Sequence, residues 1–252
     1  MKRFLCVLVA LLIATTAVLA AGRSQEAEGP RVVTVATDAT WPPMQFIDEN
    51  RRLVGYDIDL MNAIAEAAGF RVEFQNTAWD GIFAGLATGE YDAVISSVTI
   101  TEDRKATMDF SIPYINAGQV LIVQQSTTGV TSLSDLSGRR VGAQIGTTGA
   151  FEVEAAAGVE LVTYDELGLA IADLANGRIA GVVADTPIAA DYVLQNEEYS
   201  DTLMIVGEPF TDEYYGIAVR KGNAELLALI NSGLETVLQS ELPRQLEDKW
   251  LR

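Results

Sequence analysis

The chain has 252 residues, of which 49% are hydrophobic and 21% charged, and its mean hydropathy is +0.19. This composition is typical of one large or two small globular domains, and it excludes a disordered chain and a collagen. The sequence has no histidine and a single cysteine. That excludes Ser-His-Asp and Cys-His catalytic sites and zinc sites built on thiolate or imidazole. We expect neither a metal nor a cofactor.

The charge balance is strongly acidic. Lysine and arginine together number 17 and aspartate and glutamate 35, so the formal net charge at pH 7 is -18. Such a surface repels phosphate backbones by the same electrostatic interaction that attracts basic proteins to them. Nucleic-acid binding is therefore disfavoured.

The first 21 residues have the pattern of a secretory signal peptide. Lys2 and Arg3 precede an apolar run over 4–14 and a stretch of small residues over 15–21. The strongly apolar part covers about ten residues, whereas a membrane-spanning helix needs roughly 20, so a removed signal is favoured over an anchor. Cleavage near Ala20 would remove Cys6 and leave no cysteine at the new terminus to carry a lipid. We expect a periplasmic or otherwise secreted protein, with residues 22–31 as a flexible lead-in.

From Val32 onward, short β-branched runs alternate with helical patterns, which is typical of βα units around a mostly parallel sheet. The first half of the chain predicts strands at 32–37, 70–74 and 93–96 and helices at 59–68 and 81–88. Gly69 and Gly89 follow the two helices, and glycine accepts the left-handed conformation that often ends a helix.

The pattern then restarts in the second half. It predicts strands at 140–144, 160–163 and 179–184 and helices at 149–157 and 165–176. A strand at 215–219 and helices at 224–238 and 243–250 follow. Because these last elements have no sheet of their own, we expect them to return to the first unit.

Two crossings between the units predict a two-lobe α/β fold. Residues 32–116 and 216–252 would form lobe 1, and residues 117–215 would form lobe 2. A cleft between two such lobes is a usual place for a small ligand, because the carboxyl ends of strands and the N-termini of helices meet there.

Two loops in the first half combine an aspartate with an indole. Asp38 lies three residues before Trp41, and Trp79 stands next to Asp80 at the start of a helix. Both tryptophans and Asp38 are candidates for ligand binding. The alternative for each loop is structural: the aspartate caps a turn or a helix and the tryptophan packs in the core.

A third loop is rich in hydroxyl groups and ends in a cation. Ser96, Ser97 and Thr99 can hold a polar zwitterion, and Arg104 offers a fork of donors that suits a carboxylate. Hydrogen bonds of this charge-assisted kind contribute roughly 1.5 to 3 kcal/mol each. The alternative is that Arg104 pairs with Glu102 or Asp103 on the surface.

A fourth loop and the end of one strand contain the remaining candidate binding residues. Gln144, Thr147 and Thr148 lie where a helix begins, and free backbone amides there attract an anion. The loop lacks the Gly-Lys-Ser/Thr sequence of a phosphate-binding loop. Asp185 ends a buried strand and can receive an ammonium group, or it can cap a helix that has Pro187 in its first turn.

Seven motifs occur in order along residues 32 to 252. They are GYDIDL at 55–60, DAVISSVTITEDR at 92–104, MDFSIPY at 108–114, GTT at 146–148, ADTP at 184–187, YYGIA at 214–218 and KW at 249–250. Together they resemble the family 3 extracellular solute-binding proteins, the amino-acid receptors of bacterial ABC importers. The resemblance implies the two-lobe periplasmic-binding-protein fold, with a hinge of two crossing segments at about 114–118 and 213–216.

The resemblance also implies roles for individual residues. Arg104 would bind the α-carboxylate of the ligand, helped by Thr99 and the amide of Thr148. Asp185 and the carbonyl group of Ser97 would bind its α-ammonium group. Trp41 and Trp79 would sandwich the ligand side chain, and Asp38 would reach its far end. Ser96, Gln144 and Thr147 complete the expected ligand-binding set.

The far end of the expected site favours a cationic ligand. An aromatic face attracts a cation by roughly 0.5 to 2 kcal/mol, and Asp38 can pair with the charged head of arginine, lysine or histidine. Glutamine is the close alternative, since an aspartate also accepts a hydrogen bond from an amide. Some glutamine-binding relatives carry lysine at the position of Gln144 and histidine at that of Ala184, which weakens the case for glutamine.

These features predict an extracytoplasmic binding protein that captures a free polar amino acid, with a basic one favoured. The resemblance implies that it delivers that ligand to the membrane-embedded permease of an ABC transporter, and we expect it to act as a monomer. We do not expect an enzyme. A periplasmic dehydratase on the same fold is the less favoured alternative, because Asp38, Glu102 and Asp185 each have a simpler binding role than acid or base catalysis.

Overall fold

The computed structural model describes residues 30–252, so the predicted signal peptide and most of the lead-in lie outside the described residues. Residues 32–252 form one compact unit. Within the described range, no helix has both the length and the apolar composition that are needed to cross a membrane.

The first of two five-stranded sheets has the strand order β5-β1-β6-β15-β7. Its strands are β1 (Val32–Thr37), β5 (Arg71–Asn76), β6 (Ala93–Val94), β7 (Met108–Phe110) and β15 (Ala218–Arg220). Strand β1 pairs in parallel with β5 and β6, whereas β15 is antiparallel to β6 and β7. The end of the chain therefore returns to the first sheet, as the sequence predicted.

The second sheet repeats this arrangement in the order β11-β10-β12-β9-β13. Its strands are β9 (Gln119–Gln124), β10 (Arg140–Gln144), β11 (Glu160–Tyr164), β12 (Gly181–Asp185) and β13 (Leu203–Val206). Strand β10 pairs in parallel with β11 and β12, and β9 is antiparallel to β12 and β13. The two-lobe α/β fold is confirmed, while the residue boundaries of the lobes stay predictions.

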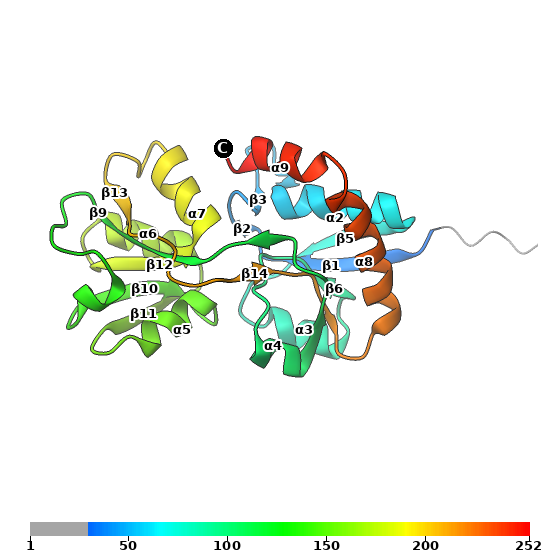
Figure 1. Ribbon diagram of the computed structural model, residues 1–252, viewed down its shortest axis with the longest axis horizontal. Helices are drawn as coiled ribbons and strands as arrows, with labels where there is room; N and C mark the ends of the chain where they lie inside the picture. The colour runs from blue at the N-terminus through cyan, green and yellow to red at the C-terminus, as the bar shows by residue number, and fades with distance from the viewer. Residues whose placement is uncertain (1–29) are drawn as a thin grey trace, which may run out of the picture. The chain divides into compact units, whose positions relative to one another are not determined.

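Helices cover both faces of each sheet (Figure 1). In lobe 1, α2 (Tyr56–Ala68) and α8 (Ala224–Leu238) share a buried cluster with Val33 and Val35, and α3 (Ile82–Thr88) packs on the opposite face with Ala36. In lobe 2, α6 (Leu167–Ala175) and α7 (Thr186–Ala190) pack with Val182, and α5 (Thr148–Ala155) packs with Val183. Shorter or terminal helical segments are α4 (Glu102–Thr107), η1 (Leu133–Leu136), η2 (Asp191–Gln195) and α9 (Leu242–Trp250).

The two crossings pair with each other. Strand β8 (Ile115–Asn116) is antiparallel to β14 (Tyr214–Tyr215), within the two segments expected to form the hinge. The single strand predicted over 215–219 was wrong, because β14 and β15 are separate strands. The two strands are separated at Gly216, where a Cβ atom would lie 2.8 Å from Ile100 Cδ1.

Helix α2 begins at Tyr56, earlier than the predicted residue 59. Gly55 precedes it with φ of 133°, and a Cβ atom there would lie 2.2 Å from the carbonyl oxygen of Met44. Asp57 and Asp59 both fall in the first turn, where the helix dipole favours negative charge. This start matters for the site, because it places the carboxylate of Asp57 inside the protein.

Several strands were not predicted. Strand β9 is a continuous buried run that lacks the polar and apolar alternation of a half-exposed strand. The three-stranded meander of β2 (Thr40–Trp41), β3 (Gln45–Ile47) and β4 (Leu53–Val54) has strands too short to show any period. The meander carries Trp41, so it is part of the architecture that shapes the site.

Candidate functional site

One cavity of about 310 Å³ is lined by twelve residues. They are Asp38, Trp41, Gln45, Trp79, Ser96, Ser97, Thr99, Arg104, Gln144, Thr147, Thr148 and Asp185. This set contains all eleven residues that the sequence singled out, with Gln45 added. That volume includes space open to solvent. Apart from the two tryptophans the lining residues are polar or charged, so the cavity suits a small polar ligand.

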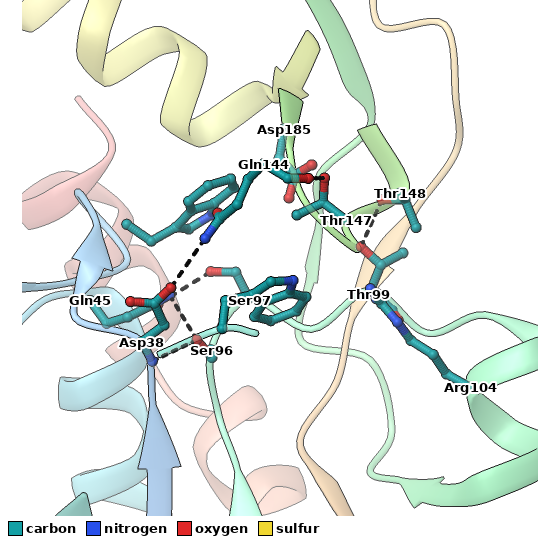
Figure 2. A pocket seen from close by; sticks show the side chains of 12 residues that line it. Asp38, Gln45, Ser96, Ser97, Thr99, Arg104, Gln144, Thr147, Thr148 and Asp185 are labelled. Carbon is teal, nitrogen blue, oxygen red and sulfur yellow. Dashed lines mark hydrogen bonds between the residues drawn. The ribbon is translucent and has the colours of Figure 1, made fainter. Parts of the chain in front are cut away.

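The cavity lies where strands of both sheets end. Asp38 directly follows β1, while Gln144 and Asp185 are the last residues of β10 and β12. Parallel strands bring their carboxyl ends to one edge of a sheet, so residues far apart in the chain converge there. Figure 2 shows the Gln144 side chain reaching toward Asp38 from the other lobe.

Asp38 is buried and held from both lobes. The Thr40 hydroxyl donates to its Oδ1 at 2.9 Å, and Gln144 Nε2 lies 3.3 Å from its Oδ2. Burial raises the pKa of Asp38, and the hydrogen bonds from Thr40 and Gln144 act in the opposite direction. Asp38 thus accepts a hydrogen bond within its own turn, as the turn-capping alternative predicted, and it also faces the cavity.

Trp41 and Trp79 are both buried and both line the cavity. Among the described residues, the indole Nε1 of Trp41 has no hydrogen-bond partner. Trp79 packs edge-on against Phe83, with ring centroids 5.1 Å apart. Gly81 rather than Asp80 occupies the N-cap position of α3, so the capping alternative for Asp80 is wrong.

Arg104 extends from α4 into the space between the lobes. Its Nη1 donates to the Thr99 carbonyl oxygen at 2.8 Å and its Nη2 to that of Gly146 at 3.2 Å. The guanidinium carbon lies 5.5 Å from the Trp79 ring centroid. Burial lowers the pKa of Arg104 to about 10, so it stays charged at neutral pH.

The surface alternative for Arg104 is wrong. Lys105 pairs with Glu102 at 2.8 Å instead, and the Thr101 hydroxyl accepts a bond from the backbone N–H of Arg104 at 3.1 Å. That bond caps α4 and starts the helix at the point from which Arg104 faces inward.

Thr147 and Thr148 begin α5 and use their hydroxyls differently. Thr147 is the N-cap: its Oγ1 accepts from the Ala150 amide at 3.2 Å. The Thr148 hydroxyl donates to Glu213 Oε2 at 2.6 Å and lies 3.4 Å from the Thr99 hydroxyl of the other lobe. Helix capping thus accounts for Thr147, and Thr148 joins the two lobes.

Asp185 is the most strongly perturbed carboxylate in the cavity. It occupies the N-cap position of α7 by its backbone, but its carboxylate accepts from the Tyr215 hydroxyl at 2.5 Å and from Gln119 Nε2. Burial raises the pKa of Asp185 to about 7, and the bonds from Tyr215 and Gln119 oppose that rise. The carboxylate is therefore directed toward the cavity and the hinge, and the capping alternative does not describe it.

The loop that carries Ser96 and Ser97 is hydrogen-bonded to residues that the sequence did not single out. Ser97 has a positive φ of 52°, and its backbone N–H donates to Asp57 Oδ2 at 2.7 Å. Gln45 lies 3.3 Å from both serine hydroxyls: its Nε2 donates to Ser96 and its Oε1 accepts from Ser97. No local pattern in the sequence marks Gln45, because the strand that it begins is only three residues long.

Other missed residues lie at the hinge end of the cavity. Gln119 Nε2 is within hydrogen-bond distance of Thr148 Oγ1 and Glu213 Oε2, at 3.1 and 3.3 Å. Asp57, Glu213 and Tyr215 occur in or beside the sequence motifs, but chain position alone assigned them no role. In residues 30–252, no group of three or more cysteine or acidic side chains could hold a metal ion.

Comparison with known proteins agrees with this geometry. The family model of the bacterial extracellular solute-binding proteins, family 3, matches residues 33–252. A probable histidine-binding protein of Neisseria gonorrhoeae is 37% identical, over 87% of this chain and 84% of its own. A putative ABC transporter arginine-binding protein 2 of Escherichia coli K12 is 34% identical, over 94% and 97%.

Two similar solved structures are of an ancestral arginine-binding protein. The one bound to arginine is 44% identical, with a TM-score of 0.83 over 88% of this chain and 98% of that chain. The one bound to glutamine is 45% identical, with a TM-score of 0.81 over 87% and 97%. This chain therefore belongs to the bacterial extracellular solute-binding proteins of family 3, and its function is solute binding rather than catalysis.

Proposed function

We propose that the protein captures a free basic amino acid (arginine, lysine or histidine) in the cavity and delivers it to the permease of an ABC transporter. It would act outside the cytoplasm as a monomer, after removal of the signal peptide. The observation that carries the proposal is that the Arg104 guanidinium and the carboxylates of Asp38 and Asp185 line the same cavity. The names of the relatives, which mention histidine, arginine and an ABC transporter, support it.

One end of the cavity suits an α-carboxylate. Arginine has five N–H donors, and Arg104 uses its Nη1 and Nη2 groups once each on carbonyl oxygens, so donors remain for a ligand. Thr148 is the first residue of α5, where backbone N–H groups have no partner within the helix. Both groups offer hydrogen bonds to an anion.

The α-ammonium group would lie against Asp185 and the carbonyl of Ser97. A zwitterion that leaves water loses hydration on both charges, and only opposite charges at a fixed separation restore it. Because Asp185 comes from lobe 2 and Ser97 from lobe 1, the ligand would join the lobes. This requirement favours a free amino acid over a sugar or a peptide.

The far end of the cavity is rich in acceptors. Gln144 Nε2 donates to Asp38 Oδ2 and to the Asp165 carbonyl oxygen at 2.8 Å. Both hydrogens of that amide are thereby used, and its oxygen is left to accept. Guanidinium and ammonium groups carry donors alone, so they match Asp38 and the Gln144 oxygen, whereas the amide oxygen of glutamine needs a donor.

Glutamine is the second candidate. An ancestral arginine-binding protein that is 45% identical to this chain has been solved with glutamine bound. Gln45 keeps a second amide hydrogen beyond the one directed at Ser96, and that hydrogen could satisfy a ligand amide oxygen.

A thermal-shift screen of the mature protein tests the proposal. The panel holds the twenty amino acids with ornithine and citrulline, an uncharged isostere of arginine. A ligand bound by the folded state alone stabilises it by about 2.7 kcal/mol at a hundred times its Kd. We expect arginine, lysine or histidine to give the largest rise in Tm and citrulline a smaller one than arginine. A rise with glutamine and citrulline but none with basic amino acids would contradict the choice of ligand.

Replacing Arg104 should remove the main partner of the ligand α-carboxylate. Arg104→Ala is expected to weaken binding of the amino acid by roughly 2 to 5 kcal/mol, because a buried carboxylate is left unpaired. Lys105→Ala is the matched control, since it removes the same charge from the neighbouring position on the surface. Isothermal titration calorimetry compares the two. Equal affinities for the two variants would show that Arg104 does not bind the ligand.

Asp38→Asn should change specificity. The variant loses a charge but keeps the shape, so Kd for arginine should rise about tenfold or more while Kd for glutamine changes little. Asp48→Asn, on an exposed ion pair with Arg52, controls for the change in net charge. Calorimetry with both ligands gives the ratio, and an equal loss for arginine and glutamine would refute the role of Asp38.

Binding should depend on pH through Asp185. Its pKa of about 7 means that the carboxyl is largely neutral below neutral pH, whereas an α-ammonium group requires the ionised form. Arginine affinity should therefore be full at about pH 8 and fall by up to about tenfold per pH unit below pH 7. Calorimetry at about pH 6.5 in buffers of different ionisation enthalpy should detect proton release, and Asp185→Asn should reduce it. No proton release in the unmodified protein would contradict this role.

A further inference from the structure

A continuous run of side chains connects the two lobes through the hinge. It starts at the backbone N–H of Ser97, which donates to Asp57 Oδ2 at 2.7 Å. The Tyr114 hydroxyl donates to Asp57 Oδ1 at 2.8 Å, and the Tyr114 ring lies 6.0 Å from the Tyr215 ring. The Tyr215 hydroxyl then donates to Asp185 Oδ2 at 2.5 Å. We call Asp57, Tyr114 and Tyr215 the hinge relay.

The hinge relay is buried, so its polar groups depend on one another. Asp57 and Tyr215 are 0% exposed, and Tyr114 is 8% exposed. A buried carboxylate is costly unless hydrogen bonds replace its water, and those of Asp57 come from Ser97 and Tyr114. Neither oxygen of Asp57 reaches the cavity lining. The hydrogen bonds of Asp57 therefore fix the positions of Ser97 and Tyr114.

One of the residues it holds is in an unusual conformation. Ser97 has φ of 52°, in the left-handed region that few residues other than glycine adopt. Such a conformation is strained and persists only where the surroundings enforce it. The short bond from the Ser97 amide to Asp57 enforces it, and so sets the direction of the adjoining carbonyl groups.

The other residue lies at the start of a crossing. Tyr114 directly precedes β8, and its backbone N–H donates to the carbonyl oxygen of Tyr215 in β14 at 3.1 Å. Hinge motions are absorbed by a few residues at the ends of elements. Within the predicted lobe bounds, the bond from Tyr114 to Asp57 belongs to lobe 1 and the bond from Tyr215 to Asp185 to lobe 2. A rotation of lobe 2 about β8 and β14 would therefore act where the rings of Tyr114 and Tyr215 meet.

We propose that the hinge relay couples the α-ammonium end of the cavity to closure of the lobes, with Asp57 and Tyr114 as positioning residues for Ser97. The proposal rests on the proposed function for the identity of the ligand. Loss of a relay hydroxyl weakens binding and leaves closure incomplete, although that hydroxyl is not part of the cavity lining.

Tyr114→Phe is the sharpest variant, because it deletes one hydroxyl and keeps the ring that packs against Tyr56 and Tyr215. Tyr164→Phe is the matched control: it removes a tyrosine bond of 2.9 Å to Asp173 in lobe 2. The measurements are Kd by calorimetry and the ligand-induced fall in the radius of gyration by small-angle scattering. The probe is arginine, or else the amino acid that most stabilises the unmodified protein.

We expect Tyr114→Phe to raise Kd about tenfold and to reduce the compaction seen at saturating ligand, while Tyr164→Phe matches the unmodified protein in both. Unchanged Kd and compaction in Tyr114→Phe would overturn the coupling. If the unmodified protein itself bound no amino acid, the proposed function would fail instead, so the two failures are distinguishable.

A double-mutant cycle separates coupling from simple loss of structure. Tyr114→Phe and Tyr215→Phe are combined, and the changes in binding free energy are compared with the changes in unfolding free energy from denaturant titration. A relay predicts that the two binding effects are not additive, because either substitution alone already breaks the connection. Additive effects on binding would contradict the proposal, whatever the effect on stability.

Discussion

The burial of ionisable groups in and behind one cavity is the constraint on which the rest of this structure depends. The groups are the carboxyls of Asp38, Asp57 and Asp185 and the guanidinium of Arg104. Loss of water raises the pKa of each carboxyl and lowers the pKa of the guanidinium. A buried charge is tolerated when hydrogen bonds replace its hydration. Gln144 Nε2 donates one such bond to Asp38, and the Gly146 carbonyl oxygen accepts one from Arg104, each from the opposite lobe.

The sheets explain how these groups meet. In each sheet the reversed strand is the one that follows a crossing: β9 comes shortly after β8, and β15 shortly after β14. The hinge is thereby continuous with a strand that has hydrogen-bonded neighbours on both sides. In the proposed closure, each lobe would move as a rigid body, and displacement would fall on the short segments that also carry Tyr114 and Tyr215.

The sequence predicted the strands and helices that have a clear local pattern of apolar residues. Strand 32–37, strand 140–144 and helix 224–238 were placed at their observed bounds, because β-branched runs and an apolar stripe specify them. Each predicted site residue lies at the end of a predicted strand or in the segment that follows it, where loops carry function, and all of them line the cavity. Whether they bind a ligand stays a prediction.

The missed features depend on contacts between distant parts of the chain. Gln45 and Gln119 are buried polar residues whose partners lie at least 29 positions away. Asp57 looked like an ordinary acidic residue at a helix start, and its partners Ser97 and Tyr114 are 40 and 57 positions away. Periodicity records local burial and carries no information on such pairs.

The two ends of the cavity are supported in different ways, and this difference bears on how specificity can vary. The Asp185 end depends on Gln119 and Tyr215, which lie next to or within the crossings. The Asp38 end depends on Thr40 and Gln144, which follow β1 and end β10. In the proposed receptor, a change at the far end would therefore alter which ligand side chain is accepted without disturbing the hinge. In the proposed receptor, this separation allows one closing mechanism to serve ligands that share an α-amino acid group and differ beyond it.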